Sequence, residues 1–100
     1  MRAIQGRIRE TRYVADEKSK AMTVTEVNEA ENPDVVYIDD SQGFHKVGAL
    51  SPEGAVSLHL YSPPFNKCRC WVDANNVDKV MHPVMTYYSE NGEVIDYENI

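Results

Sequence analysis

The sequence predicts an all-β fold, a small sandwich or barrel of the jelly-roll kind, formed as one domain over residues 1–100. Three observations lead to this prediction. Six to eight short stretches alternate apolar and polar side chains with the period of two that a strand requires. Turn signals rich in Gly, Pro, Asn and Asp separate these stretches at spacings of about ten residues. No stretch has the periodicity of a helix.

The expected strands follow one another along the whole chain. They are residues 4–13, 21–27, 35–38, 44–48, 54–65 and 80–88. The first should present Arg7 and Arg9 on a basic, solvated face, and Pro83 should confine the last to an edge or a bulge. Charged residues 16–20 and the Asn91-Gly92 pair predict turns, the acidic segment 28–34 predicts a solvated loop, and the tail 96–100 is expected to fray.

Composition and charge narrow the function classes. With 42% hydrophobic and 26% charged residues the chain has the make-up of a soluble globular domain. A net charge of -6 argues against nucleic acid or an anionic membrane surface as the main partner. No apolar run approaches the roughly 18 residues of a membrane span, and no signal peptide is expected at the N-terminus. Cys68 and Cys70 have no further cysteine to pair with, which favours a reducing, cytoplasmic setting.

The stretch 54–65 is the most informative, because a strand there would have two chemically different faces. One face would be hydrocarbon from Val56, Leu58 and Leu60, and this face is expected to be buried. The other face would carry a hydroxyl, an imidazole and a phenol, from Ser57, His59 and Tyr61. A row of polar groups on a core strand is typical of a pocket wall.

Each histidine has a functional and a structural interpretation. If its face of the strand points into a barrel, His45 is a candidate ligand for a transition metal; otherwise it is a half-exposed loop histidine. His59 and Tyr61 lie about 7 Å apart on one face, and they form either a hydrogen-bonded site pair or a satisfied core pair. His82, before a proline, is expected to be solvated and to have no role.

The two cysteines form a Cys-x-Cys motif whose thiols would share one face of a strand. They are either part of a metal site or two small buried hydrophobic side chains. A structural zinc site needs four ligands, and the only other soft candidates in this chain are the histidines.

Three segments, taken in order, resemble one known family. They are Tyr37 to Val47, then Ala55 to Phe65 with its Ser-Leu-His-Leu-Tyr-Ser-Pro-Pro-Phe run, and then Met85 to Ser89. Together they resemble the cysteine dioxygenase family, which are non-haem iron thiol dioxygenases with a cupin fold. The second segment is nearly identical to the animal-type motif of that family. The resemblance spans nearly the whole chain and implies the C-terminal half of a cupin domain.

The resemblance implies a reaction and three site residues. His45 matches the third iron ligand, Tyr61 matches the active-site tyrosine, and His59 matches the histidine that hydrogen-bonds and orients this tyrosine. The family adds both atoms of O2 to the thiol of L-cysteine at a ferrous iron, giving cysteine sulfinate. The implied partners are therefore a small-molecule thiol, L-cysteine, and O2.

The sequence departs from the family pattern at the metal-binding residues. The other two iron ligands of the family form a His-x-His pair, and this sequence has none. The chain alone is therefore expected to be inactive. Its open sheet edges are expected to be covered by a homodimer or by a missing N-terminal half, or to be repaired by a rearranged sandwich. Two other functions stay open: a non-catalytic cupin-like module for binding or assembly, and a thiol dioxygenase acting on a mercapto-acid.

Overall fold

The computed structural model describes residues 1–95, and over this range the fold is all-β, as predicted. One short 3₁₀ helix, η1 Asp40–Gln42, interrupts the succession of strands. The strands are β1 Arg2–Gln5, β2 Arg7–Asp16, β3 Ala21–Glu31, β4 Phe44–Ala49, β5 Val56–Leu58, β6 Cys70–Trp71, β7 Val80–Met81, β8 Ser89–Glu90 and β9 Glu93–Val94. Within residues 1–95 no helix is long and apolar enough to cross a membrane.

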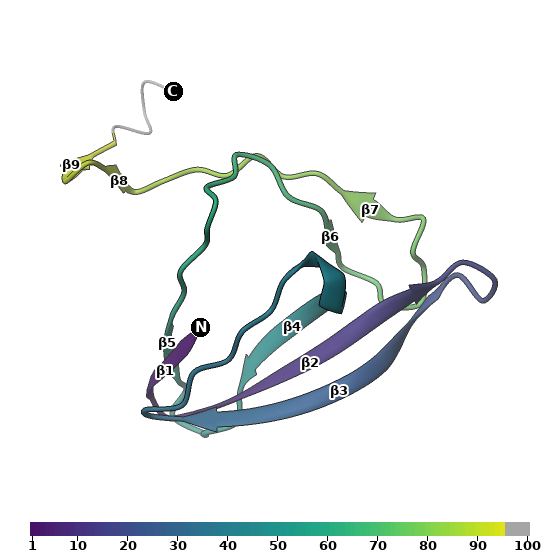
Figure 1. Cartoon of the computed structure of the whole chain (residues 1–100), viewed down its shortest axis with the longest axis horizontal. Helices are drawn as coiled ribbons and strands as arrows, with labels where there is room; N and C mark the ends of the chain where they lie inside the picture. The colour runs from purple at the N-terminus through teal and green to yellow at the C-terminus, as the bar shows by residue number, and fades with distance from the viewer. Residues whose placement is uncertain (96–100) are drawn as a thin grey trace.

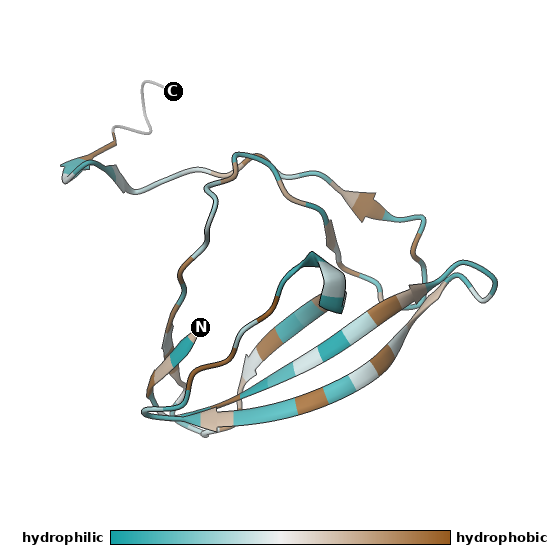
Figure 2. Cartoon of the chain, viewed as in Figure 1, coloured by the Kyte–Doolittle hydropathy of each residue, from teal (hydrophilic) through white to brown (hydrophobic). Residues whose placement is uncertain are grey.

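The largest sheet is antiparallel and has the strand order β3-β2-β4 (Figure 1). Strands β2 and β3 form a long hairpin whose tip is the predicted charged turn. There the Asp16 carboxylate accepts hydrogen bonds from the backbone N–H groups of Lys18 and Ser19, and Lys20 takes a positive φ of 59°. Hydrophobic bands are interspersed among hydrophilic ones along β2 and β3 (Figure 2).

The outer face of the hairpin carries the basic side chains that the sequence predicted to be solvated. Arg7 and Arg9 are exposed, and both pair with Glu29 on the neighbouring strand, at 2.7 and 3.4 Å. These pairs extend β3 beyond the expected end at Val27, through the acidic residues up to Glu31. The prediction of a loop over 28–31 was therefore wrong, because cross-strand pairing with arginines outweighs the weak strand preference of Glu and Asn.

Three two-stranded ladders complete the structure: β1 with β5, β6 with β7, and β8 with β9. The last is the predicted hairpin at Asn91-Gly92, where both residues have positive φ. Its continuation over 96–100 lies outside the described residues. The expected strand 4–13 divides at Gly6, which has φ +72° and leaves no room for a Cβ atom.

Two other expected strands are much shorter than predicted. Residues 35–38 make only an isolated bridge, from Val35 to Arg2, although Val36 exchanges backbone hydrogen bonds with Met1. In the stretch 80–88 only β7 is a strand, and Pro83 lies just beyond it, where the missing N–H ends regular pairing.

An aromatic contact joins the beginning of β4 to β6. The rings of Phe44 and Trp71 lie 4.5 Å apart, and the guanidinium of Arg69 lies over both rings, at 5.3 and 5.6 Å. The indole N–H of Trp71 donates to the carbonyl of Val77 at 3.0 Å. These contacts attach the β6-β7 ladder to the main sheet, at the strand that carries His45.

The structure is an open set of sheets with a small core. In the described range the buried hydrophobic residues are Ala3, Ile8 and Ala30. The radius of gyration is 15.7 Å, compared with about 13 Å for a compact 100-residue domain. Such openness agrees with the expectation of an incomplete jelly-roll barrel.

The expectation of a buried strand over 54–65 was wrong. Strand structure is confined to β5, and the supposed core face is exposed: Val56 by 51%, Leu58 by 65% and Leu60 by 89%. Among the described elements β5 pairs only with β1, so no second layer covers its apolar side chains. Period-two alternation fixes which residues share a face, but burial needs a partner for that face.

Candidate functional site

His45 lies on β4, and its ring is held by a buried carboxylate. The register places His45 opposite Arg12 on β2, and Glu10 is two residues away on the same face of β2. The Nδ1 atom of His45 lies 2.8 Å from Oε2 of Glu10. The side chain of Glu10 is 1% exposed and that of His45 is 27% exposed. The interpretation of His45 as a loop histidine was therefore wrong.

Glu10 is surrounded by donors on one face of the three-stranded sheet. Arg12 Nε donates to its Oε1 at 2.8 Å and Asn28 Nδ2 donates to the same oxygen at 3.1 Å. Burial by itself would raise the pKa of Glu10, but the hydrogen bonds from His45, Asn28 and Arg12, with the charge of Arg12, bring the pKa below its ordinary value. Glu10 is therefore an ionised acceptor at neutral pH.

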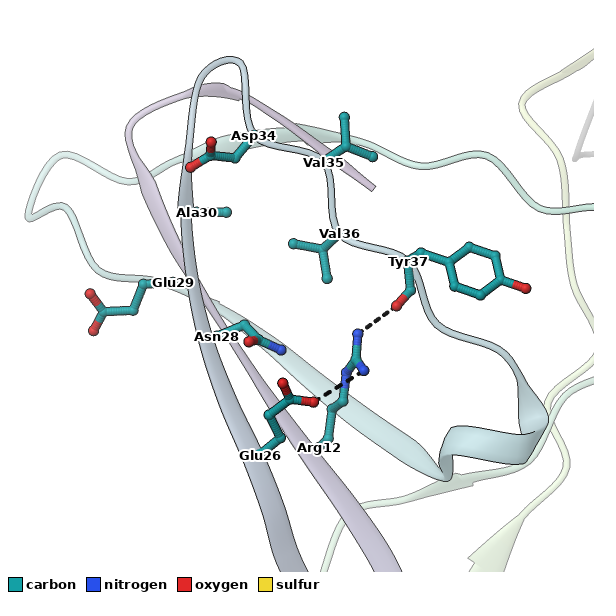
Figure 3. A pocket seen from close by; sticks show the side chains of 9 residues that line it. All are labelled: Arg12, Glu26, Asn28, Glu29, Ala30, Asp34, Val35, Val36 and Tyr37. Carbon is teal, nitrogen blue, oxygen red and sulfur yellow. Dashed lines mark hydrogen bonds and ion pairs between the residues drawn. The ribbon is translucent and has the colours of Figure 1, made fainter.

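Arg12 connects this cluster to the segment that follows β3. Its guanidinium pairs with Glu10 and with Glu26, the latter at 3.2 Å, and also donates to the backbone carbonyl of Tyr37. Figure 3 shows the side chain lying between Glu26 and Tyr37, in an open depression that Asn28 and Val36 also line. Each of its three guanidinium nitrogens donates to a protein partner, so Arg12 is a structural support of the cluster.

A capped turn sets the start of the strand that carries His45. Asp39 caps η1 by accepting from the backbone N–H of Ser41, and its carboxylate also bonds the Ser41 hydroxyl. The phenol of Tyr37 donates to Asp39 at 3.0 Å. The hydrogen bonds from Ser41 and Tyr37 lower the pKa of Asp39. Gly43 then turns the chain into β4 with φ +96°.

His59 and Tyr61 lie just beyond β5, and both are exposed. Their rings stack at a centroid distance of 6.3 Å, close to the expected spacing, and Tyr61 meets Phe65 edge to face at 5.1 Å. The interpretation of a buried core pair was wrong, since Tyr61 is 58% exposed. Among the described hydrogen bonds none joins His59 to Tyr61, so the interpretation of a hydrogen-bonded pair is not supported either. Tyr61 thus presents its ring and hydroxyl on an open surface next to Phe65.

The imidazole of His59 is bonded to a serine. Its Nε2 atom lies 2.8 Å from the hydroxyl of Ser57, two residues earlier on the same face. Partial burial lowers the pKa of His59, and the positive charges of the amino terminus and of His45 lower it further. His59 is therefore favoured in its neutral form.

The described residues do not by themselves make a metal site. Within residues 1–95 no group of three or more His, Cys, Asp or Glu side chains lies close enough together to hold a metal ion. His45 has the donor chemistry of one ligand, an imidazole with one nitrogen already bonded to a carboxylate. One imidazole does not hold iron, because affinity depends on several ligands in a fixed geometry.

The remaining candidates have no part in this arrangement. Cys68 and Cys70 are free and half-buried, and the sulfur of Cys68 lies 3.9 Å from that of Met85. Neither belongs to a metal-holding group among residues 1–95. His82 is exposed, as predicted.

Sequence reasoning missed Glu10, Arg12 and Asn28. The spacing of residues along β2 could have identified two of them. Glu10 and Arg12 follow Ile8 at intervals of two, so they share its buried side of the strand. The other side of the strand carries Arg7 and Arg9. A Glu and an Arg on the apolar side of a strand are expected to be paired, with each other or with a neighbouring strand.

The chain matches known proteins over nearly its full length. The family model "Cysteine dioxygenase type I" matches residues 1–74. Cysteine dioxygenase type 1 of Danio rerio is 34% identical over an alignment 106 residues long that covers 98% of this chain and 49% of the relative. The Bos taurus and Homo sapiens proteins of that name are 37% identical over 95 residues, covering 92% of this chain and 46% of each relative.

The chain therefore spans about half the length of the curated relatives it matches. No solved structure matches it. The family match covers more than half of the chain and includes β1 to β6 with His45, His59 and Tyr61. On this evidence the chain belongs to the cysteine dioxygenase type I family.

Proposed function

We propose that this chain forms part of a thiol dioxygenase that converts L-cysteine and O2 into cysteine sulfinate at a ferrous iron. In this proposal His45 is one iron ligand, and His59 and Tyr61 form the wall beside the substrate. Membership of the family supports the reaction class. The main structural support is the 2.8 Å contact between Nδ1 of His45 and the buried carboxylate of Glu10. Because Nδ1 is engaged in this contact, the other ring nitrogen, Nε2, is the one available to bind a metal.

The surface around Tyr61 fits a substrate wall. Tyr61 and His59 are both exposed, and the bond to Ser57 together with ring stacking restricts the orientation of His59. A phenol hydroxyl can donate a hydrogen bond to the substrate or to O2. Ferrous iron, when bound, would supply coordination of the thiolate and of O2.

In this proposal His45 is the one iron ligand that the described residues supply. His45 is the single histidine of the sequence that matches a ligand position of the family, and the implied His-x-His pair does not occur in this sequence. We therefore expect the 100-residue chain alone to hold no stoichiometric iron and to show no cysteine-dependent uptake of O2.

The reaction can be tested in a chimaera in which these 100 residues replace the matched segment of the Danio rerio relative, which covers 49% of that protein. With Fe(II), L-cysteine and O2 the chimaera should form cysteine sulfinate, detected by mass spectrometry. The His45→Ala chimaera should form none, and the His82→Ala chimaera should match the parent, because His82 is exposed and has no role in the proposal.

A folded chimaera that makes no sulfinate from cysteine would overturn the proposed reaction. Turnover of a mercapto-acid in place of cysteine would overturn the substrate and retain the reaction class. A folded chimaera that oxidises neither thiol would support the alternative of a non-catalytic binding or assembly module.

A further inference from the structure

We propose that Glu10 is a positioning residue which holds His45 as the Nδ1–H tautomer, so that the Nε2 lone pair is the one presented for coordination. This inference deepens the proposed function and depends on it only in assigning a metal to Nε2. The tautomer itself follows from the contacts in the chain.

The first step concerns which group donates between Glu10 and His45. The carboxylate of Glu10 is ion-paired with the guanidinium of Arg12 at 2.8 Å and has only acceptor atoms. Its Oε2 lies 2.8 Å from Nδ1 of His45. Nδ1 must therefore carry the proton of this bond. In a neutral imidazole only one nitrogen carries a proton, so Nε2 has a free lone pair.

The second step concerns the other oxygen of Glu10. Arg12 Nε at 2.8 Å and Asn28 Nδ2 at 3.1 Å both donate to Oε1. An arginine N–H cannot accept, and the amide nitrogen of Asn28 cannot accept either. Each oxygen of Glu10 therefore has a fixed function: Oε1 accepts from Arg12 and Asn28, and Oε2 accepts from His45.

Because the two oxygens of Glu10 have different partners, Glu10→Gln should change the tautomer of His45 while keeping the shape of the side chain at residue 10. The glutamine carbonyl oxygen must take the Oε1 place, because an NH2 group there would meet two donors. The NH2 group then faces His45 Nδ1, which must accept. The proton of the neutral ring would move to Nε2, and the lone pair presented for coordination would be lost.

The test is a long-range ¹H–¹⁵N NMR spectrum of the histidine rings in the ¹⁵N-labelled 100-residue chain. The spectrum is recorded at an alkaline pH of about 9, so that the rings are in their neutral form. His59→Gln and His82→Gln variants assign the His45 signals. His45 should show a protonated Nδ1 and an unprotonated Nε2, and in Glu10→Gln the two assignments should be exchanged.

Glu26→Gln is the matched control. Glu26 also accepts from Arg12, at 3.2 Å, but its carboxylate makes no contact with His45 among the described hydrogen bonds. This variant should leave the His45 tautomer unchanged. If a fold defect obscured the Glu10→Gln spectrum, the parent spectrum would still decide, because a protonated Nε2 in the parent would overturn the inference.

The outcomes separate this inference from the proposed reaction. If Glu10→Gln keeps the Nδ1–H form, Glu10 does not set the tautomer, whatever the chimaera does. If the tautomer exchanges but the chimaera is inactive, the inference stands and the proposed reaction fails. If the tautomer exchanges and the chimaera is active, Glu10→Gln in the chimaera should weaken iron binding by about 10- to 100-fold, as for other groups that orient metal-bound histidines.

Discussion

Arg12 Nε lies 2.8 Å from Oε1 of Glu10, and both side chains are withdrawn from solvent, with 12% and 1% of their surfaces exposed. The pair lies on the same face of β2 as Ile8, next to the small hydrophobic core. A buried carboxylate is tolerated when hydrogen bonds satisfy both oxygens, and loss of one partner leaves an uncompensated charge.

The first prediction concerns this pair. Arg12→Leu should lower the free energy of unfolding by about 3 kcal/mol, because Glu10 remains buried with one donor fewer and no neutralising charge. Arg7→Leu removes an exposed pair with Glu29 and should cost less than about 1 kcal/mol. Urea unfolding followed by circular dichroism measures both. Equal effects of the two substitutions would show that the Arg12 pair behaves as a surface pair.

The second prediction concerns acid stability. The folded-state pKa of Glu10 is lowered, so its contribution is fully present above the unfolded-state value of about 4.3 and is lost as the pH falls through the lower folded value. Glu10→Gln should therefore have a flatter dependence of unfolding free energy on pH below about 5 than the parent. Urea midpoints at pH 7, 5, 4 and 3 measure this. Parallel curves for the two proteins would contradict the assignment.

The third prediction concerns the turn into the strand of His45. A Cβ atom at Gly43 would collide with the carbonyl oxygen of Tyr13, and φ there is +96°, so Gly43→Ala should destabilise the fold by about 1–3 kcal/mol or more. Gly48, on the same strand β4, has open space around its Cβ position, and Gly48→Ala should change stability by less than about 1 kcal/mol. Thermal unfolding would compare the two. A neutral Gly43→Ala would mean that this turn does not have the described conformation.

The fourth prediction contrasts an exposed and a buried apolar residue. Leu60 is 89% exposed and Ile8 is 3% exposed. In the 100-residue chain Leu60→Ser should change the unfolding free energy by less than about 0.5 kcal/mol, while Ile8→Ala should cost about 2–5 kcal/mol. Urea unfolding at low protein concentration is the measurement. A large loss at Leu60 would mean that another layer covers this residue.

The two turns that depend only on neighbouring residues could be predicted from the sequence. The turn at 16–20 forms through Asp16, and the hairpin at Asn91-Gly92 forms because both residues tolerate positive φ. Burial of the stretch 54–65 could not be predicted in this way, because alternation says nothing about whether a second layer is present. The extension of β3 to Glu31 depended on arginines of another strand, more than 20 residues earlier.

The site also combines features that depend on neighbouring residues with features that depend on long-range strand pairing. His45 could be identified as a candidate from the family resemblance and from the face it shares with Val47. The partner that fixes its ring, Glu10, is 35 residues away and is brought near by the register of β2 and β4. That register follows from strand pairing, which a single sequence does not specify. The bond of Ser57 to His59 needs no long-range pairing, since the two residues share one face two positions apart.

If His45 is an iron ligand, the iron content of the purified chimaera with the Danio rerio relative must depend on it. Inductively coupled plasma mass spectrometry should find about one iron per chain in the parent and in His82→Ala, and almost none in a folded His45→Ala variant. Full iron occupancy in His45→Ala would show that His45 is not a ligand.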